Sequence, residues 1–148
     1  MKKAIVELIK SIDEDIKVVF HKGALECDIE ENTVYIGNEL TDEEDELFLD
    51  FVKELNPRCN YNAFLMGILH EVGHLLTYDE DLDRDRDDQY AIMQIAYKFG
   101  LCDTNILNKE YFKIPLELNA TQWAIDFAIA NQSRMDKFNQ VITKRRNG

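Results

Sequence analysis

Residues 64–76 read FLMGILHEVGHLL, an apolar segment that carries two histidines and one glutamate. Its apolar residues recur at helical spacing and cover most of the helix circumference, so we expect a central helix that is largely buried. Asn60 or Asn62 can cap its start, because an asparagine side chain accepts a hydrogen bond from the free amides of the first turn. The two histidines are therefore expected in a mostly apolar environment.

His70, Glu71 and His74 form an HExxH motif within this helix. Histidines four residues apart differ by about 40° around a helix, so both imidazoles reach one point. Two neutral imidazoles suit zinc, which binds nitrogen and oxygen donors in a tetrahedron. Glu71 lies about 100° further round, where it can take a proton from a metal-bound water. The motif predicts His70 and His74 as zinc ligands and Glu71 as general base and acid.

A catalytic zinc ion needs a third protein ligand, with water in the fourth position. No histidine follows His74, so the ligand must be another residue type. The best candidate is Glu117, in the segment PLELNATQWA over residues 115–124. Glu80 or an acid of the charged run after the motif, such as Asp79, remains an alternative.

Small residues accompany Glu117 on one stripe of its expected helix. The stripe consists of Glu117, Ala120, Ala124 and Ala128. Small side chains let two helices approach closely, as a carboxylate must to reach a metal on the motif helix. Gly67 and Gly73 would offer matching room on that helix.

The two motifs together resemble the ImmA/IrrE-type metallopeptidases of phages, mobile elements and stress regulons. That family pairs HExxH with a downstream helix of pattern E-x-E-A-N-x-F-A. In this chain the pattern is matched by Glu117, Ala120 and Ala124, with Trp123 in place of Phe. Asn119 stands where the second Glu usually lies, so among these positions Glu117 alone keeps a carboxylate.

The resemblance implies a zincin-like fold with one zinc ion and a Glu as third ligand, as in gluzincins. It also implies limited proteolysis of a regulatory protein partner, often a repressor. The same resemblance assigns His70, His74 and Glu117 to the metal and Glu71 to catalysis. We expect a zinc-dependent endopeptidase on this basis.

Local patterns predict a single α+β domain over residues 1–148, with an N-terminal helix within 1–14. Three short β-rich runs then suggest an antiparallel meander: Lys17–Phe20, Leu25–Ile29 and Thr33–Gly37. Further helices are expected from Thr41 to about Leu55 and, after the motif helix, over about Gln89–Phe99 and Pro115–Gln132. Gly100 suits the C′ position of the third of these four helices.

The remaining segments are predicted without regular structure. The run DEDLDRDRDD over residues 79–88 is expected as a solvated loop with local Arg–Asp pairs. A second loop is expected around Asn105 and Asn108, and residues 133–148 form a polar tail.

Charge and composition limit the partners. The chain has 29 acidic and 17 Lys and Arg residues, which gives a net charge of −12. Such a charge repels phosphate backbones and anionic lipids, so we expect neither nucleic acid nor a membrane as partner. No apolar run approaches a transmembrane length or a signal core, so we expect a cytoplasmic protein. Its three cysteines, Cys27, Cys59 and Cys102, are expected to be reduced.

Two other functions stay open. Peptide deformylases combine HExxH with an upstream Cys ligand, and Cys27 is suitably placed, although Gly73 stands where their HExDH motif has Asp. A zinc-stabilised protein that binds a regulator without cleaving it would also fit the small, acidic chain. The donor that stabilises a transition-state oxyanion is not ranked by the sequence; the candidates are Tyr78, Tyr90, Tyr97, Tyr111 and His21.

Overall fold

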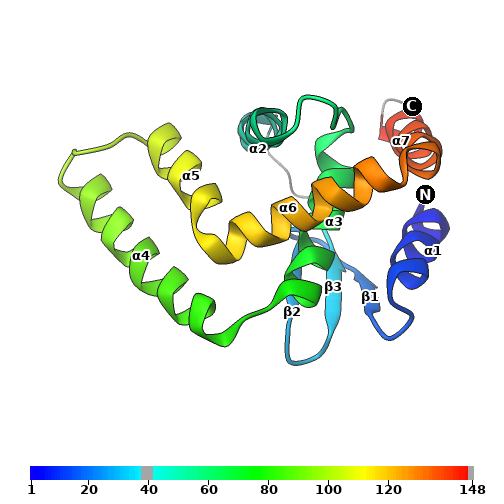
Figure 1. Cartoon of the computed structure of the whole chain (residues 1–148), viewed down its shortest axis with the longest axis horizontal. Coiled ribbons are helices and arrows are strands. Elements are labelled where there is room, and N and C mark those ends of the chain that lie inside the picture. The colour runs from blue at the N-terminus through cyan, green and yellow to red at the C-terminus, as the bar shows by residue number, and fades with distance from the viewer. Residues whose placement is uncertain (38–41, 147–148) are drawn as a thin grey trace.

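The computed structural model describes residues 1–37 and 42–146, so the expected start at Thr41 lies outside the described residues. Within these ranges the chain forms seven helices and a small three-stranded sheet, which confirms the predicted α+β class (Figure 1). The elements are α1 (Lys2–Ile12), β1 (Lys17–Phe20), β2 (Glu26–Asp28), β3 (Thr33–Ile36), α2 (Asp42–Leu55), α3 (Ala63–Thr77), α4 (Glu80–Lys98), α5 (Thr104–Lys113), α6 (Pro115–Ala130) and α7 (Gln132–Arg146). None of the described helices is both long and apolar enough to cross a lipid bilayer.

Helices α3 and α6 cross at the centre of the molecule, with the sheet on one side and α1 and α7 at one end (Figure 1). The side chain of Asn62 caps α3 by accepting a hydrogen bond from Leu65 N, which decides between the two predicted caps. The buried apolar core draws on α1, β3, α3, α6 and α7, and its members include Ile5, Leu8, Ile9, Val34, Ile36, Leu65, Met66, Ile68, Leu69, Val72, Ala124, Ile125, Ala128 and Met135. The motif helix is therefore central and largely buried, as predicted.

The contact between α3 and α6 is close because small residues meet there. A Cβ atom at Gly73 would lie only 2.5 Å from the carbonyl oxygen of Ala120. Ala120, Ala124 and Ala128 are all fully buried, so the predicted stripe of small residues does face another element. Gly67 serves a different contact, because a Cβ there would lie 2.8 Å from Cδ2 of Leu25.

The sheet is mixed rather than the predicted antiparallel meander. Its strand order is β1-β3-β2, in which β3 pairs with β1 in parallel and with β2 in antiparallel orientation. The predicted β2–β3 hairpin is confirmed, and Asn32 in its turn has a φ of 48°. The expected direct pairing of β1 with β2 is wrong.

Gly37 shows why β1 and β2 lie on opposite sides of β3. A side chain at Gly37 would collide with the carbonyl oxygens of Gly23 and Ala24, so the β1–β2 loop passes directly over the end of β3. His21 N also donates to the carbonyl oxygen of Ile36 at 3.1 Å, which fixes the loop there. This crossing depends on packing between distant residues, so the local strand pattern did not reveal it.

The acidic run was predicted as a loop, but it forms the first half of α4. The Asp79 side chain caps the helix by accepting from Leu82 N, and further acids occupy the first turn. Acidic residues near a helix N-terminus interact favourably with its dipole. Asp–Arg pairs three residues apart add support, including Arg86 with Asp83 at 2.7 Å. The same residues that suggested a solvated loop therefore stabilise a solvated helix.

Two further segments are helical where no helix was expected. Asp103 caps α5 by accepting from Ile106 N, so the segment around Asn105 and Asn108 is not a loop. Residues predicted as a polar tail belong to α7, which buries Met135 in the core. Gly100 follows α4 with a φ of 71°, as predicted for a C′ glycine.

Replacing either glycine of α3 with alanine tests the close approach of α3 and α6. Gly73→Ala should lower the free energy of unfolding by about 1–3 kcal/mol, because the obstacle is the backbone of α6. Gly67→Ala is the matched control: Leu25 can rotate away, and alanine favours a helix by about 1 kcal/mol over glycine. Urea unfolding of both variants in the presence of a chelator measures the difference. Equal stabilities would contradict the proposed contact.

Candidate metal centre

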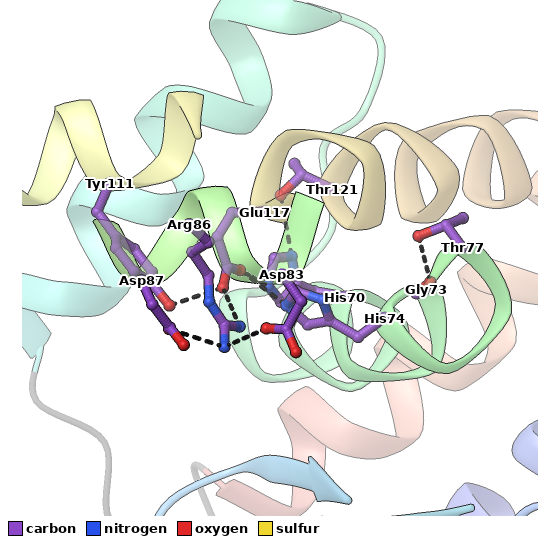
Figure 2. Close-up of polar contacts among 10 residues, drawn as sticks. All are labelled: His70, Gly73, His74, Thr77, Asp83, Arg86, Asp87, Tyr111, Glu117 and Thr121. Atoms are coloured by element: carbon purple, nitrogen blue, oxygen red, sulfur yellow. Dashed lines mark hydrogen bonds and ion pairs between the residues drawn. The ribbon is translucent and has the colours of Figure 1, made fainter. Parts of the chain in front are cut away.

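His70, His74 and Glu117 converge where α3 crosses the first turn of α6 (Figure 2). Oε2 of Glu117 lies 3.0 Å from Nε2 of His70 and 2.7 Å from Nε2 of His74. One potential ligand atom from each residue lies within 4.8 Å of the other two. Donors about 2 Å from a tetrahedral ion are about 3.3 Å apart, so only small shifts are needed to admit one. The group could hold a metal ion.

The start of α6 places Glu117 in this position. Pro115 occupies the first turn, where its missing N–H costs no hydrogen bond. Glu117 follows in the same turn, near the positive end of the helix dipole, and is only 3% exposed. A buried carboxylate is costly unless it is paired, so its partners carry much of the local stability.

Each oxygen of Glu117 has its own set of partners. Oε2 faces the two imidazoles, whereas Oε1 accepts a hydrogen bond from the Tyr111 hydroxyl at 2.6 Å. Nη1 of Arg86 lies 3.5 Å from the same Oε1, and Arg86 is itself held by Asp83 (Figure 2). Oε1 is thereby held in place while Oε2 is left for a ligand.

Thr121 orients one of the two histidines. Nδ1 of His70 lies 2.9 Å from Oγ1 of Thr121, one turn after Glu117 on α6. In the contact with Oε2 of Glu117 the Nε2–H donates; with a metal ion bound, Nδ1–H would donate to Thr121 and the lone pair of Nε2 would face the ion. Such outer hydrogen bonds fix the tautomer and ring orientation of metal-binding histidines.

Electrostatics favour a charged carboxylate at the centre. Burial alone would raise the pKa of Glu117, but hydrogen bonds from His70 and His74 outweigh it and hold the pKa far below its usual range. Burial by itself would lower the pKa of His74. The hydrogen bond and the charge of Glu117 outweigh burial, so the pKa of His74 is raised overall. Glu117 therefore stays ionised, as a metal ligand must.

Glu71 lies beside the cluster but is not one of its three members. Burial raises the pKa of Glu71, and the nearby His70 and His74 oppose this shift. Cys27 on β2 lines the same cavity as Glu71, and the thiol pKa is raised by burial and then by that carboxylate. The structure thus brings an upstream cysteine to the site without placing it in the ligand cluster.

Two cavities meet at the cluster, and both are lined by His70, Glu71, Tyr111 and Glu117. One, of about 240 Å³, has an apolar wall that includes Leu25, Phe48 and Phe112. The other, of about 330 Å³, has a polar wall that includes Glu26, Asp83 and Arg86. A ligand that spans both would pass over Glu71 and the potential metal ligands.

The structure also separates the candidates that the sequence left open. Asp79 caps α4 and Glu80 is exposed, so neither joins the cluster. Among the possible oxyanion donors, Tyr111 contacts the cluster directly. The others have different partners or are exposed: Tyr78 donates to Asp83, Tyr90 makes an edge-to-face contact with Tyr111, Tyr97 is exposed and His21 bonds to the carbonyl oxygen of Ala24.

Arg86 and Thr121 were not predicted as site residues. Thr121 lies four residues after Glu117, so the helical spacing alone puts both on one face and could have identified it. Arg86 gave no such signal, because its contact with Glu117 depends on how α4 packs against α6.

No protein-family model, curated protein or solved structure matches this chain.

Glu117→Ala should remove most of the bound metal, because it deletes the one oxygen ligand between the two imidazoles. Elemental analysis of purified protein should give about one equivalent of a divalent metal in the wild type and much less in the variant. Glu80→Ala is the control, since it removes the alternative acid and should leave the metal content unchanged. If only the Glu80→Ala variant lost its metal, the third ligand would be Glu80 on α4 and not Glu117.

Thr121→Val should weaken metal affinity by about 10–100-fold, because it removes the oxygen that orients His70 while keeping the side-chain volume. Competition with a chromophoric chelator measures the affinity. Thr77→Val serves as control, because the Thr77 hydroxyl donates to the carbonyl oxygen of Gly73 and not to an imidazole. Equal metal affinity in the two variants would contradict an orienting role for Thr121.

Proposed function

We propose that this protein is a zinc-dependent endopeptidase. The observation that carries the proposal is the convergence of His70, His74 and Glu117 on one point, with Glu71 beside them at a cavity. Two imidazoles and one carboxylate form a donor set typical of catalytic zinc, which leaves a fourth position for water. The same donors also bind manganese or iron, so metal analysis forms part of the test.

Zinc in this position supplies Lewis acidity, which makes water a stronger acid and polarises a peptide carbonyl. The chain's own residues provide the rest. Glu71 takes the proton from the attacking water and gives it to the leaving amine. Tyr111 and Arg86 hold Oε1 of Glu117, which keeps its other oxygen directed at the imidazoles.

The two cavities favour a peptide as substrate. A chain lying across the site would place a side chain against the apolar wall formed by Leu25, Phe48 and Phe112. On the other side it would meet Arg86 and the acids around it. The resemblance to ImmA/IrrE-type metallopeptidases supports a regulatory protein, such as a repressor, as the natural substrate.

Cys27 favours keeping a deformylase-like hydrolase as the second candidate, because its thiol lies against Glu71. That mechanism would need Cys27 as a metal ligand. Cys27→Ser separates the two: zinc content should be unchanged if Glu117 is the ligand and should fall if the thiol is.

Glu71→Gln should retain zinc but lose cleavage by at least about 100-fold, because the amide cannot accept the proton of the attacking water. Zinc-loaded protein is incubated with a randomised peptide library, and products are counted by mass spectrometry with and without chelator. Glu54→Gln is the matched control on an exposed turn of α2. Undiminished cleavage by Glu71→Gln would refute the mechanism. A wild type that binds zinc but cuts no peptide would favour the non-catalytic binding protein.

A further inference from the structure

Helix α4 carries a seam of exposed residues along its outer side. We define the seam as Asp81, Asp85, Asp88, Ile92, Ile95 and Phe99. Their spacing alternates between four and three residues, which keeps them on one side of a helix. Its first half is acidic and its second half is apolar.

The apolar half is unusually open to solvent. Ile92 is 67% exposed, Ile95 is 55% exposed and Phe99 is 77% exposed. Leu101, just past the end of α4, is 79% exposed and extends the apolar surface. All residues of α4 are described, and none of them is buried. Contiguous exposed apolar patches on a protein surface mark interaction sites, whereas single exposed apolar residues need no explanation.

The seam faces away from the rest of the molecule. The side of α4 that contacts the body carries Arg86 and Met93, which are partly buried and lie more than about 100° around the helix from the centre of the seam. Figure 1 shows α4 at the outer edge, on the far side of the molecule from α1 and α7. Among the seam residues, Ile92 borders another described element: it lines an open hollow with Glu110 and Lys113 of α5 and stays 67% exposed.

The charges of the seam indicate what kind of partner binds to it. Asp85 and Asp88 form no ion pair with any described residue, whereas Asp81 pairs with Arg84. A second copy of the chain matches poorly, because a parallel pairing opposes acid to acid and an antiparallel pairing opposes acid to isoleucine. The net charge of −12 adds to this repulsion.

We propose that the seam binds a helix of a different protein, one that carries large apolar residues at one end and Lys or Arg at the other, in the same alternating spacing. The apolar contacts with Ile92, Ile95 and Phe99 provide most of the affinity. The basic residues pair with Asp85 and Asp88 and set the register and the rate of association. The proposal concerns binding alone and is independent of the metal centre and of any cleavage.

Designed helical peptides of about 21 residues, or three heptads, test the proposal with the full chain. One labelled peptide carries leucines followed by lysines at the seam-facing positions, and a second carries them in reverse order. Matched acidic peptides replace the lysines with glutamates. Fluorescence anisotropy should show one basic peptide binding at least about tenfold more tightly than its acidic counterpart. Higher salt should reduce that difference.

The double variant Ile92→Lys/Ile95→Lys should weaken binding of the basic peptide by about tenfold or more. Val19→Lys/Val141→Lys is the control. It also replaces two exposed apolar residues with lysines, and so adds the same charge, but at other places on the surface. Equal binding of basic and acidic peptides, or equal losses in the two double variants, overturns the proposal. It is also overturned if sedimentation shows a wild-type dimer that the seam variant dissociates, because the occupant is then a second copy.

Discussion

The contact between Glu117 and the two imidazoles is the interaction on which the rest of the site depends. It requires α6 to approach α3 closely, and this is possible because Gly73 meets the backbone of Ala120 with no side chain between them. The alanines that follow on α6 keep the two helices together along the core. Any residue larger than glycine at position 73 would move the carboxylate away from the histidines.

Burying this carboxylate is expensive, and the surrounding residues show how the cost is met. Oε2 lies against two imidazole nitrogens, and Oε1 receives the Tyr111 hydroxyl with Arg86 close by. Removing one partner of such a group leaves an uncompensated buried charge, which is more costly than the pair is worth. The arrangement therefore fixes one rotamer of Glu117, with one oxygen anchored and the other available. A cation between the imidazoles would add to this set of partners without requiring a new fold around it.

Sequence patterns predicted the parts of this site that depend on helical spacing. The motif on α3 and the position of Glu117 on a stripe of small residues follow from local rules, and the structure has them where expected. Local rules narrowed the cap of α3 to Asn60 or Asn62, and the structure selects Asn62. The mixed sheet was not predictable in this way, since the position of β1 depends on a loop that crosses Gly37. Arg86 was missed for the same reason: its role comes from the path of α4, and the acidic run around it hid the helix.

The composition of α4 makes sense once its two sides are considered separately. On the inner side, Arg86 needs acids such as Asp83 to hold it near Glu117. On the outer side, Asp85 and Asp88 form no ion pair with a described residue, and the isoleucines beyond them stay more than half exposed. Acids at a helix start stabilise the helix, but that explains only the first turn. The later acids and the exposed apolar residues therefore need a reason outside the fold, and a complementary helix supplies one for both halves at once.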